Sequence, residues 1–299
     1  MNLKEYLNSV ECETGLLSII LDLARASEGI YDAVSTNEAG KKLTSENASG
    51  ETQMALDVRS NNIITDILEV NENVSVVGSE ELEDLPVFRD SGYAVVYDPL
   101  DGSSLLDVNL AVGTIVGIYE GVGILGRTGD DQVAALIFVY GPRLTAMLTV
   151  RKGTHEFTFI DGEWILTREN IKLDKEKKMY APGNLRAVSS NLKYRDLINY
   201  WLDNQYTLRY SGGMVPDINQ ILLKGCGVFT YPGYDVAPNG KLRLVFECAP
   251  MALLIEQAGG KASDGSIRLL DKPIGEIHQR TTIFIGKTEE VDIALDYLG

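Results

Sequence analysis

The hydrophobic periodicity of the chain changes repeatedly between the pattern of a helix and that of a strand. Apolar residues recur at helical intervals over 13–34 and 54–68, which predicts two amphipathic helices. Over 74–159, short apolar runs alternate with turns rich in Gly, Pro and Asp, which predicts mostly sheet. The polar stretch 35–51, rich in Gly, Ser and Asn, predicts a loop.

The second half of the chain mixes the two patterns more closely. Helices are predicted at 194–202, 216–223, 250–258 and 289–298, and strands at 227–231, 241–246 and 281–286. This order predicts a mixed α/β chain without repeats, and 299 residues suit two fused domains. The most charged stretch, 168–178, predicts a boundary between an N-terminal domain of 1–175 and a C-terminal domain of 176–299.

Carboxylates follow three of the apolar runs. The run 93–97 ends in D-P-L-D-G-S-S at 98–104, the run 74–77 is followed by Glu80 and Glu81, and the run 241–246 is followed by Glu247. Carboxylate oxygens suit Mg²⁺, while turn N–H groups and hydroxyls suit phosphate oxygens. The pattern therefore predicts metal-assisted hydrolysis of a phosphate ester. The alternative for 98–104 alone is a solvated Asp-Pro-x-Asp-Gly turn.

The charge of the chain narrows the class of partner. There are 43 acidic and 27 basic residues, a formal net charge of −16, which argues against nucleic acid as a partner. An anionic substrate remains compatible with this charge, because bound divalent cations and a few placed Lys and Arg reverse the sign locally. No apolar run is long enough to span a membrane, so no membrane partner is expected.

The cysteines and histidines exclude other chemistries. Cys12, Cys226 and Cys248 are odd in number and far apart, which predicts reduced, buried thiols in a cytoplasmic protein. The N-terminus has neither the pattern of a secretory signal nor the composition of a transit peptide. The two histidines, His155 and His278, are expected to be structural, so a histidine triad or zinc site is not expected.

The motif D-P-L-D-G-S-S resembles the signature of the class I fructose-1,6-bisphosphatase and sedoheptulose-1,7-bisphosphatase family, within a wider group of lithium-sensitive, Mg²⁺-dependent phosphatases. Four further segments resemble the same family in the same order, at 129–135, 140–143, 208–220 and 239–252. The resemblance implies the layered α/β sugar-phosphatase fold, with alternating helix and sheet layers in two fused domains. It also implies a homodimer or homotetramer.

The resemblance assigns the reacting end of the site residue by residue. The implied ligands of two or three Mg²⁺ ions, for which Mn²⁺ can substitute, are Glu80, Asp98, the carbonyl of Leu100, Asp101 and Glu247. The implied acids that position and deprotonate the attacking water are Asp57 and Glu81. Glu51 falls where the family has a loop aspartate, one methylene shorter. The implied cradle for the departing 1-phosphate is Gly102, Ser103 and Ser104.

The resemblance also assigns residues to the distal end of the site, the end that binds the phosphate that does not react. The residues implied to bind the non-reacting phosphate and the sugar are Arg209, Tyr210, Met214, Tyr231 and Lys241. In the family, the arginine can reach across a subunit interface. Arg243 either adds charge to this group or pairs with an acid.

The identity of the sugar stays open at this stage, because different segments resemble different branches of the family. The segments at 153–157 and 180–187 resemble the sedoheptulose branch, whereas Tyr231 and 239–252 resemble the fructose branch. Asn184 and Arg186 are the candidate specificity residues. We therefore expect a 1-phosphatase acting on sedoheptulose 1,7-bisphosphate, fructose 1,6-bisphosphate or both.

Three alternatives remain: an enzyme for fructose 1,6-bisphosphate only, an enzyme similar to inositol monophosphatase, and a catalytically silent metabolite sensor. The cations and tyrosines of the distal end argue against a monophosphatase, since a monophosphate needs no second phosphate pocket. A sensor is free to lose metal ligands, yet every ligand position holds the expected carboxylate.

Overall fold

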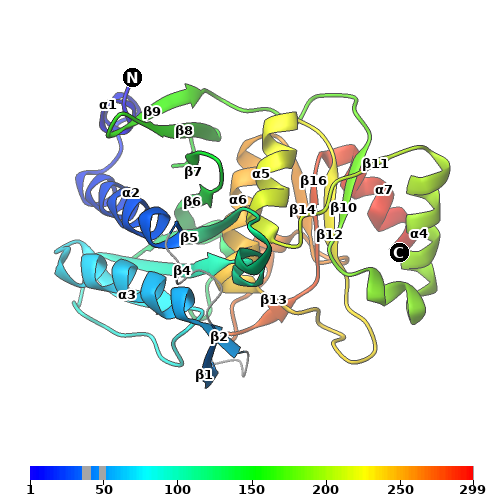
Figure 1. Ribbon diagram of the computed structural model, residues 1–299, viewed down its shortest axis with the longest axis horizontal. Helices are drawn as coiled ribbons and strands as arrows, with labels where there is room; N and C mark the ends of the chain where they lie inside the picture. The colour runs from blue at the N-terminus through cyan, green and yellow to red at the C-terminus, as the bar shows by residue number, and fades with distance from the viewer. Residues whose placement is uncertain (36–41, 47–51, 299) are drawn as a thin grey trace.

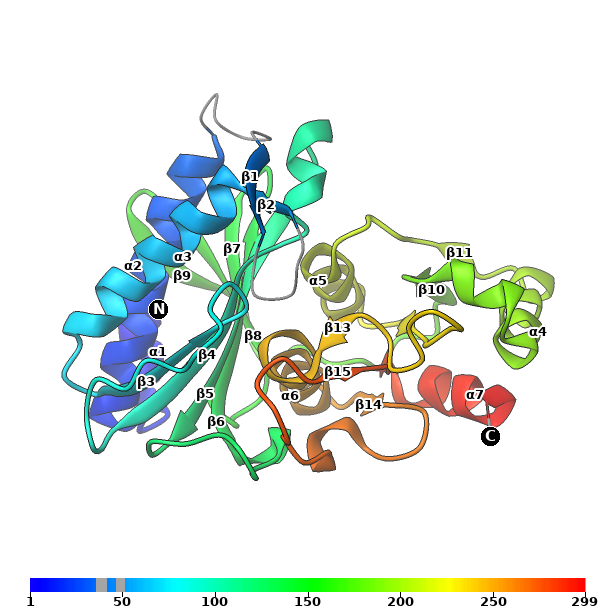
Figure 2. The same ribbon diagram turned by 90° about the horizontal axis from the view of Figure 1, so that it is seen from below.

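The computed structural model describes residues 1–35, 42–46 and 52–298, and within them helices and sheets alternate in layers (Figures 1 and 2). One outer layer is formed by α1 (Leu3–Ser9), α2 (Thr14–Val34) and α3 (Ala55–Val70), and the opposite outer layer by α4 (Leu192–Asp203) and α7 (Thr288–Leu298). Two sheets lie between these layers, with α5 (Met214–Lys224) and α6 (Ala249–Gln257) between the sheets. This arrangement confirms the predicted layered α/β fold.

The larger sheet has seven strands in the order β3-β4-β5-β6-β7-β8-β9. The strands are β3 (Val74–Ser79), β4 (Tyr93–Asp101), β5 (Val112–Glu120), β6 (Gln132–Tyr140), β7 (Leu144–Thr149), β8 (His155–Ile160) and β9 (Glu163–Arg168). β3 pairs with β4 in parallel, and the remaining neighbours are antiparallel. The structure thus confirms the sheet predicted over 74–159.

Both faces of β4 are buried, because consecutive side chains point to opposite faces of a strand. Val95 and Tyr97 pack against α2 and α3, whereas Ala94 and Val96 pack into the core that contains α5 and α6. The sequence of this strand is therefore a continuous apolar run without alternation, as expected for a sheet covered on both sides.

The smaller sheet has five strands in the order β11-β10-β12-β16-β14. The strands are β10 (Met179–Pro182), β11 (Thr207–Leu208), β12 (Val228–Tyr231), β14 (Lys261–Ser263) and β16 (Ile283–Gly286). Its outer face packs on α4 and α7 through a cluster that includes the fully buried Trp201. Two short two-stranded ladders complete the sheets, β1 (Lys42–Glu46) with β2 (Thr52–Met54) and β13 (Leu242–Arg243) with β15 (Arg280–Thr281).

The two halves of the chain share one core. The cluster between the sheets includes Val96 and Ile137 of the larger sheet, Leu254 of α6, and Ile285 of the smaller sheet. The connection from β9 to β10 runs along the segment 169–178 (Figure 1). The domain boundary within this segment stays a prediction. No helix among the described residues is long and apolar enough to cross a membrane.

Two predicted elements are wrong. The strand predicted at 241–246 ends at Arg243, and Leu244–Cys248 forms a π-helical turn that leads into α6. The apolar run could not reveal this, because a short buried run has the same composition in a strand and in a buried helix. The loop predicted over 35–51 contains β1, which pairs with β2.

Candidate active site

Asp98 and Asp101 are delivered by the irregular end of β4. The pairing of β4 with β5 is interrupted between these two residues, so both carboxylates reach the same side. The N–H of Leu100 donates to Asp98 Oδ1 at 2.9 Å. The N–H of Val215, in the first turn of α5, donates to Asp101 Oδ2 at 2.7 Å. Gly102 then turns the chain with φ of +79°, a conformation that glycine adopts without steric cost.

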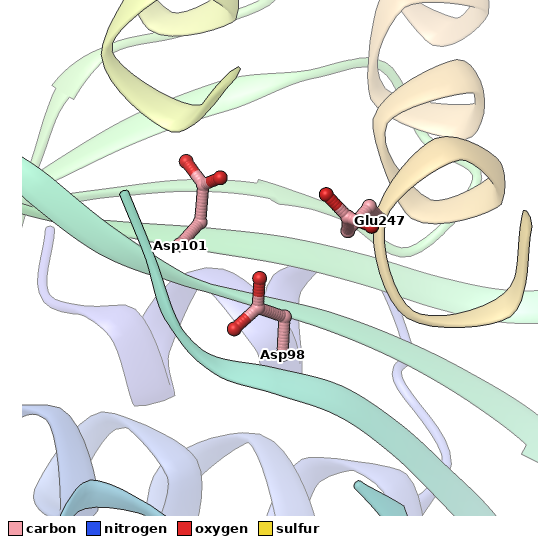
Figure 3. Close-up of side chains that lie close together, drawn as sticks. All are labelled: Asp98, Asp101 and Glu247. Carbon is pink, nitrogen blue, oxygen red and sulfur yellow. The ribbon is translucent and has the colours of Figure 1, made fainter. Parts of the chain in front are cut away.

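Glu247 approaches the same point from the π-helical turn. Its Oε2 accepts a hydrogen bond from the backbone N–H of Arg243 at 2.6 Å. π-Helical turns occur frequently at functional sites, where they reorient a side chain. As a result, carboxylate oxygens of Asp98, Asp101 and Glu247 lie within 4.8 Å of one another, and Figure 3 shows the three side chains facing a common space.

Glu80 joins this cluster from the segment after β3. Its Oε1 lies 2.9 Å from Arg243 Nη1, and both side chains are buried. Arg243 therefore pairs with an acid. This decides between the two roles considered for it from the sequence, which were to add charge to the distal end of the site or to pair with an acid. Its backbone and its guanidinium hold two different acids of the cluster, Glu247 and Glu80.

Burial and mutual repulsion raise the pKa values of the cluster. Burial is the largest cause of the raised pKa of Asp98, and the charges of Glu80, Asp101 and Glu247 add to it. Burial also raises the pKa of Asp101 to about 7, against the hydrogen bond from Val215. The pKa of Glu247 is raised by burial and by Glu80, and Arg243 only partly offsets this. A buried set of oxygen ligands with excess negative charge fits a divalent cation, whose charge would compensate it.

A cavity of about 430 Å³ surrounds the cluster, a size typical of small-molecule sites. It brings together 13 of the residues named from the sequence, drawn from well-separated segments of the chain: Asp57, Glu80, Glu81, Asp98, Leu100, Asp101, Gly102, Ser103, Ser104, Tyr210, Tyr231, Lys241 and Glu247. Gly212, Leu242 and Arg243 also line it. The lining therefore combines carboxylates with two serine hydroxyls, two tyrosines and Lys241.

Several residues named from the sequence lie outside this lining. The buried Asn184 donates from Nδ2 to the carbonyl of Pro232 at 2.9 Å, so its amide fixes a turn. Met214 is buried at the start of α5. Arg186 is not in the lining, but its positive charge lowers the pKa values of Tyr210 and Tyr231, against the burial that raises both. The roles in substrate binding that were predicted for Asn184, Met214 and Arg186 stay predictions.

Two further residues named from the sequence remain, Arg209 and Glu51. Arg209 lines a different cavity, with Lys224 at the C-terminal end of α5. Glu51 lies outside the residues that the structure describes.

Comparison with known proteins matches this chain along its whole length. The family model described as the fructose-1,6-bisphosphatase N-terminal domain matches residues 3–169, and that of the C-terminal domain matches residues 173–299. The chain belongs to the fructose-1,6-bisphosphatase family. The resemblance found from the D-P-L-D-G-S-S motif is thereby confirmed, and with it the class of enzyme, a phosphoric monoester hydrolase.

Relatives in this family carry two kinds of name. The class 1 fructose-1,6-bisphosphatase of Geobacter sulfurreducens is 44% identical, over 100% of this chain and 96% of its own length. The chloroplastic sedoheptulose-1,7-bisphosphatase of Spinacia oleracea is 40% identical, over 97% of this chain and 76% of its own length. The crystal structure of Leishmania major fructose-1,6-bisphosphatase in holo form superimposes with a TM-score of 0.94 at 32% identity, covering 99% of this chain and 98% of that one.

Sequence reasoning missed two residues that support the family's site. His278 Nε2 lies 2.9 Å from the carbonyl of Leu82, and its ring lies 5.3 Å from that of Phe246. A carbonyl only accepts, so Nε2 carries the proton. The contact joins the segment after Glu80 to the turn that carries Glu247, which gives the structural role expected of His278 a definite form. No local pattern could reveal it, because the two partners are 196 residues apart.

Asp217 is the second missed residue. It is buried in the first turn of α5, and its Oδ1 accepts from the N–H of Ser211 at 2.9 Å. The loop that it holds contains Gly212, part of the cavity lining. Asp217 therefore fixes the loop between Tyr210 and the start of α5, where Val215 supports Asp101.

Burial raises the pKa of Asp217 from 3.8 to about 6. The native state therefore binds this proton more readily than the unfolded state, so the contribution of Asp217 to stability is lost as the pH rises from about 4 to about 6. We expect Asp217→Asn, which keeps the Oδ1 acceptor, to reduce the fall in unfolding free energy over that range by up to about 3 kcal/mol.

Urea unfolding of both proteins at several pH values measures this difference. The exposed Asp66→Asn is the matched control and is expected to leave the pH dependence unchanged. An equally steep pH dependence in Asp217→Asn and in the parent protein would contradict the assignment.

Proposed function

We propose that this chain is a Mg²⁺-dependent sugar-bisphosphate 1-phosphatase, which hydrolyses sedoheptulose 1,7-bisphosphate and fructose 1,6-bisphosphate to the monophosphate and inorganic phosphate. The observation that carries the proposal is one cavity whose lining holds both the carboxylate cluster of Asp98, Asp101 and Glu247 and the cation Lys241. The names of the bacterial and plant relatives agree with both substrates. We place the enzyme in the cytoplasm, in keeping with its free cysteines.

In this mechanism the carboxylate cluster holds the cofactor. Two or three Mg²⁺ ions would be bound by Glu80, Asp98, the carbonyl of Leu100, Asp101 and Glu247. When bound, Mg²⁺ lowers the pKa of a coordinated water and stabilises developing charge on the phosphoryl oxygens. The buried acids contribute the matching negative charge, and the N–H groups of Leu100 and Val215 hold two of them in place.

The remaining residues of the site contact the attacking water and the phosphate that is released. Asp57 and Glu81 line the same cavity, and in the proposed reaction they orient the water and accept its proton. The water oxygen forms a bond to the 1-phosphorus as the bond from phosphorus to the sugar oxygen breaks, and the sugar oxygen takes up a proton. Gly102, Ser103 and Ser104 donate hydrogen bonds to the phosphate that leaves.

We expect activity to require Mg²⁺ or Mn²⁺ and Asp98→Asn to lower kcat by about 100-fold or more, since it removes a charge that holds the metal. Phosphate release measured against metal concentration checks both. The exposed Asp84→Asn makes the same charge change after β3 and is expected to keep normal turnover. Full activity in excess chelator would refute the metal mechanism.

The distal phosphate needs a second copy of the chain in this proposal. Lys241 lines the cavity, but Arg209 of the same chain faces a different one. The edge strand β11 ends just before Arg209, and Leu208 and Tyr210 beside it are exposed apolar or aromatic residues. We therefore propose a homodimer, alone or within a homotetramer, in which each chain lends Arg209 to the site of its neighbour.

We expect Lys241→Ala and Arg209→Ala each to raise KM for a bisphosphate by about 10- to 100-fold, the cost of one charge-assisted hydrogen bond. Much smaller effects are expected with a sugar monophosphate. Hybrids of Asp98→Asn and Arg209→Ala subunits are expected to regain a site with normal KM, because one subunit supplies Asp98 and the other Arg209. Equal effects on both substrate types would show that these residues are structural.

The preference between the two sugars is proposed to depend on Arg186. Its charge acts on Tyr210 and Tyr231, both in the cavity wall. A seven-carbon sugar carries its distal phosphate one carbon further out, where a long, charged side chain can follow it.

We expect kcat/KM for sedoheptulose 1,7-bisphosphate to equal or exceed that for fructose 1,6-bisphosphate. Arg186→Tyr is expected to shift the ratio about tenfold towards fructose. Kinetics with both sugars on parent and variant measure this ratio. A clear preference for fructose 1,6-bisphosphate that Arg186→Tyr leaves unchanged would exclude the assignment, while leaving the phosphatase proposal intact.

A further inference from the structure

A second cavity, of about 190 Å³, has a strongly cationic wall. Its lining is Lys177, Lys178, Met179, Thr207, Arg209, Gln220, Lys224 and Cys226. Three separate regions contribute the cations: the end of the connection to β10, the residue after β11, and the last turn of α5. The lining contains four cations and no carboxylate. This sign is opposite to that of the whole chain, whose formal net charge is −16.

None of these four cations is in an ion pair within the described part of the chain. Two other lysines of the C-terminal half are paired: Lys261 lies 2.6 Å from Asp292, and Lys287 lies 3.3 Å from Glu176. In contrast, Lys178 lies over the ring of Tyr206, and Arg209 donates to the carbonyl of Leu208. Within the described residues these four positive charges form no salt bridge, although the charge of Lys178 acts on the buried Glu290.

The buried Cys226 in the lining senses this positive charge. Burial raises the pKa of its thiol, the charges of Lys177, Lys175 and Lys287 lower it, and the charge of Glu290 raises it. Lys172 and Lys175 line an adjacent cavity along the same segment together with Arg168, Glu169 and Asp174, so that neighbouring surface is of mixed charge. A concave surface of one sign concentrates ions of the opposite sign.

We propose that this cavity binds a small anion through a phosphate group. Lysine ammonium and arginine guanidinium groups form charge-assisted hydrogen bonds with phosphate oxygens, and the hydroxyl of Thr207 and the amide of Gln220 are additional donors. The volume lies below the roughly 300 Å³ at which pockets for drug-sized ligands begin, so the cavity suits an inorganic phosphate, a pyrophosphate or the phosphate end of a metabolite.

This cavity and the proposed active site lie at opposite ends of α5. Val215, in the first turn, donates to Asp101, whereas Gln220 and Lys224, in the later turns, line the cationic cavity. The helix has 11 residues, so the two sites are separated by roughly 15 Å along it. Arg209 is the one cation of this cavity that the proposed function also uses, so the test substitutes Lys178 and Lys224 instead, and its failure is distinguishable from failure of the proposed function.

The test is calorimetric titration of metal-free protein with inorganic phosphate and with pyrophosphate. The chelator used to remove the metal is itself removed by dialysis, because it is also an anion. Without metal, the carboxylate cluster repels phosphate, so binding at the active site is suppressed. Lys178→Gln/Lys224→Gln removes two cations of the cavity and keeps amide donors. The control Lys4→Gln/Lys152→Gln makes the same charge change at exposed lysines elsewhere.

We expect the parent to bind both anions, with an affinity that falls as salt is raised. The cavity variant is expected to bind at least about tenfold more weakly, while the control binds like the parent. Absence of binding by the parent, or equal loss in the cavity variant and the control, would overturn the proposal. So would a cavity variant that dissociates into smaller oligomers with unchanged phosphate affinity, since the cations would then serve a second copy of the chain.

Discussion

The repulsion among buried carboxylates is the constraint around which this part of the molecule is organised. Asp98, Asp101, Glu80 and Glu247 come from three segments, and burial alone already raises the pKa values of three of them. Each acid is held by a group that cannot move independently of the fold: the N–H of Leu100, the N–H of Val215, the guanidinium of Arg243 and the N–H of Arg243, respectively. Such a cluster persists because packing elsewhere offsets its cost.

The layered core supplies that packing. α5 and α6 lie between two sheets, and each presents one terminal region to the cluster, α5 through Val215 and α6 through the π-helical turn before it. Because both helices are buried between sheets, a shift of either would open cavities on two sides, which costs several kcal/mol for each large side chain uncovered. The position of Glu247 relative to Asp101 is therefore fixed by helix packing rather than by a local turn.

Charge is distributed unevenly over the molecule. The net charge of −16 is an average over the whole chain. The cations lie at specific points: Arg243 inside the cluster, Lys241 on the cavity wall, and four cations in the cavity at the far end of α5. An enzyme of anionic sugars needs this arrangement, since a uniformly acidic surface would repel both substrate and product.

The sequence by itself determined the helix and strand periods, the D-P-L-D-G-S-S turn and most of the chemistry of the site, because each is a property of neighbouring residues. It also predicted thirteen residues that the structure collects in one cavity. Its failures are at positions where local composition is ambiguous, as at Leu244–Cys248, where a buried apolar run becomes a π-helical turn. Cys12 was expected to be buried and is partly exposed.

Only the tertiary structure decided which distant groups meet. The pairing of Arg243 with Glu80, the contact of His278 with the carbonyl of Leu82, and the support of Asp101 by Val215 join residues more than 100 positions apart. The tertiary structure also places the adjacent residues Arg209 and Tyr210 in two different cavities. Consecutive side chains of an extended segment point to opposite sides, which allows this separation. Contacts of this kind depend on how layers pack, and packing is a property of the whole chain rather than of any short pattern within it.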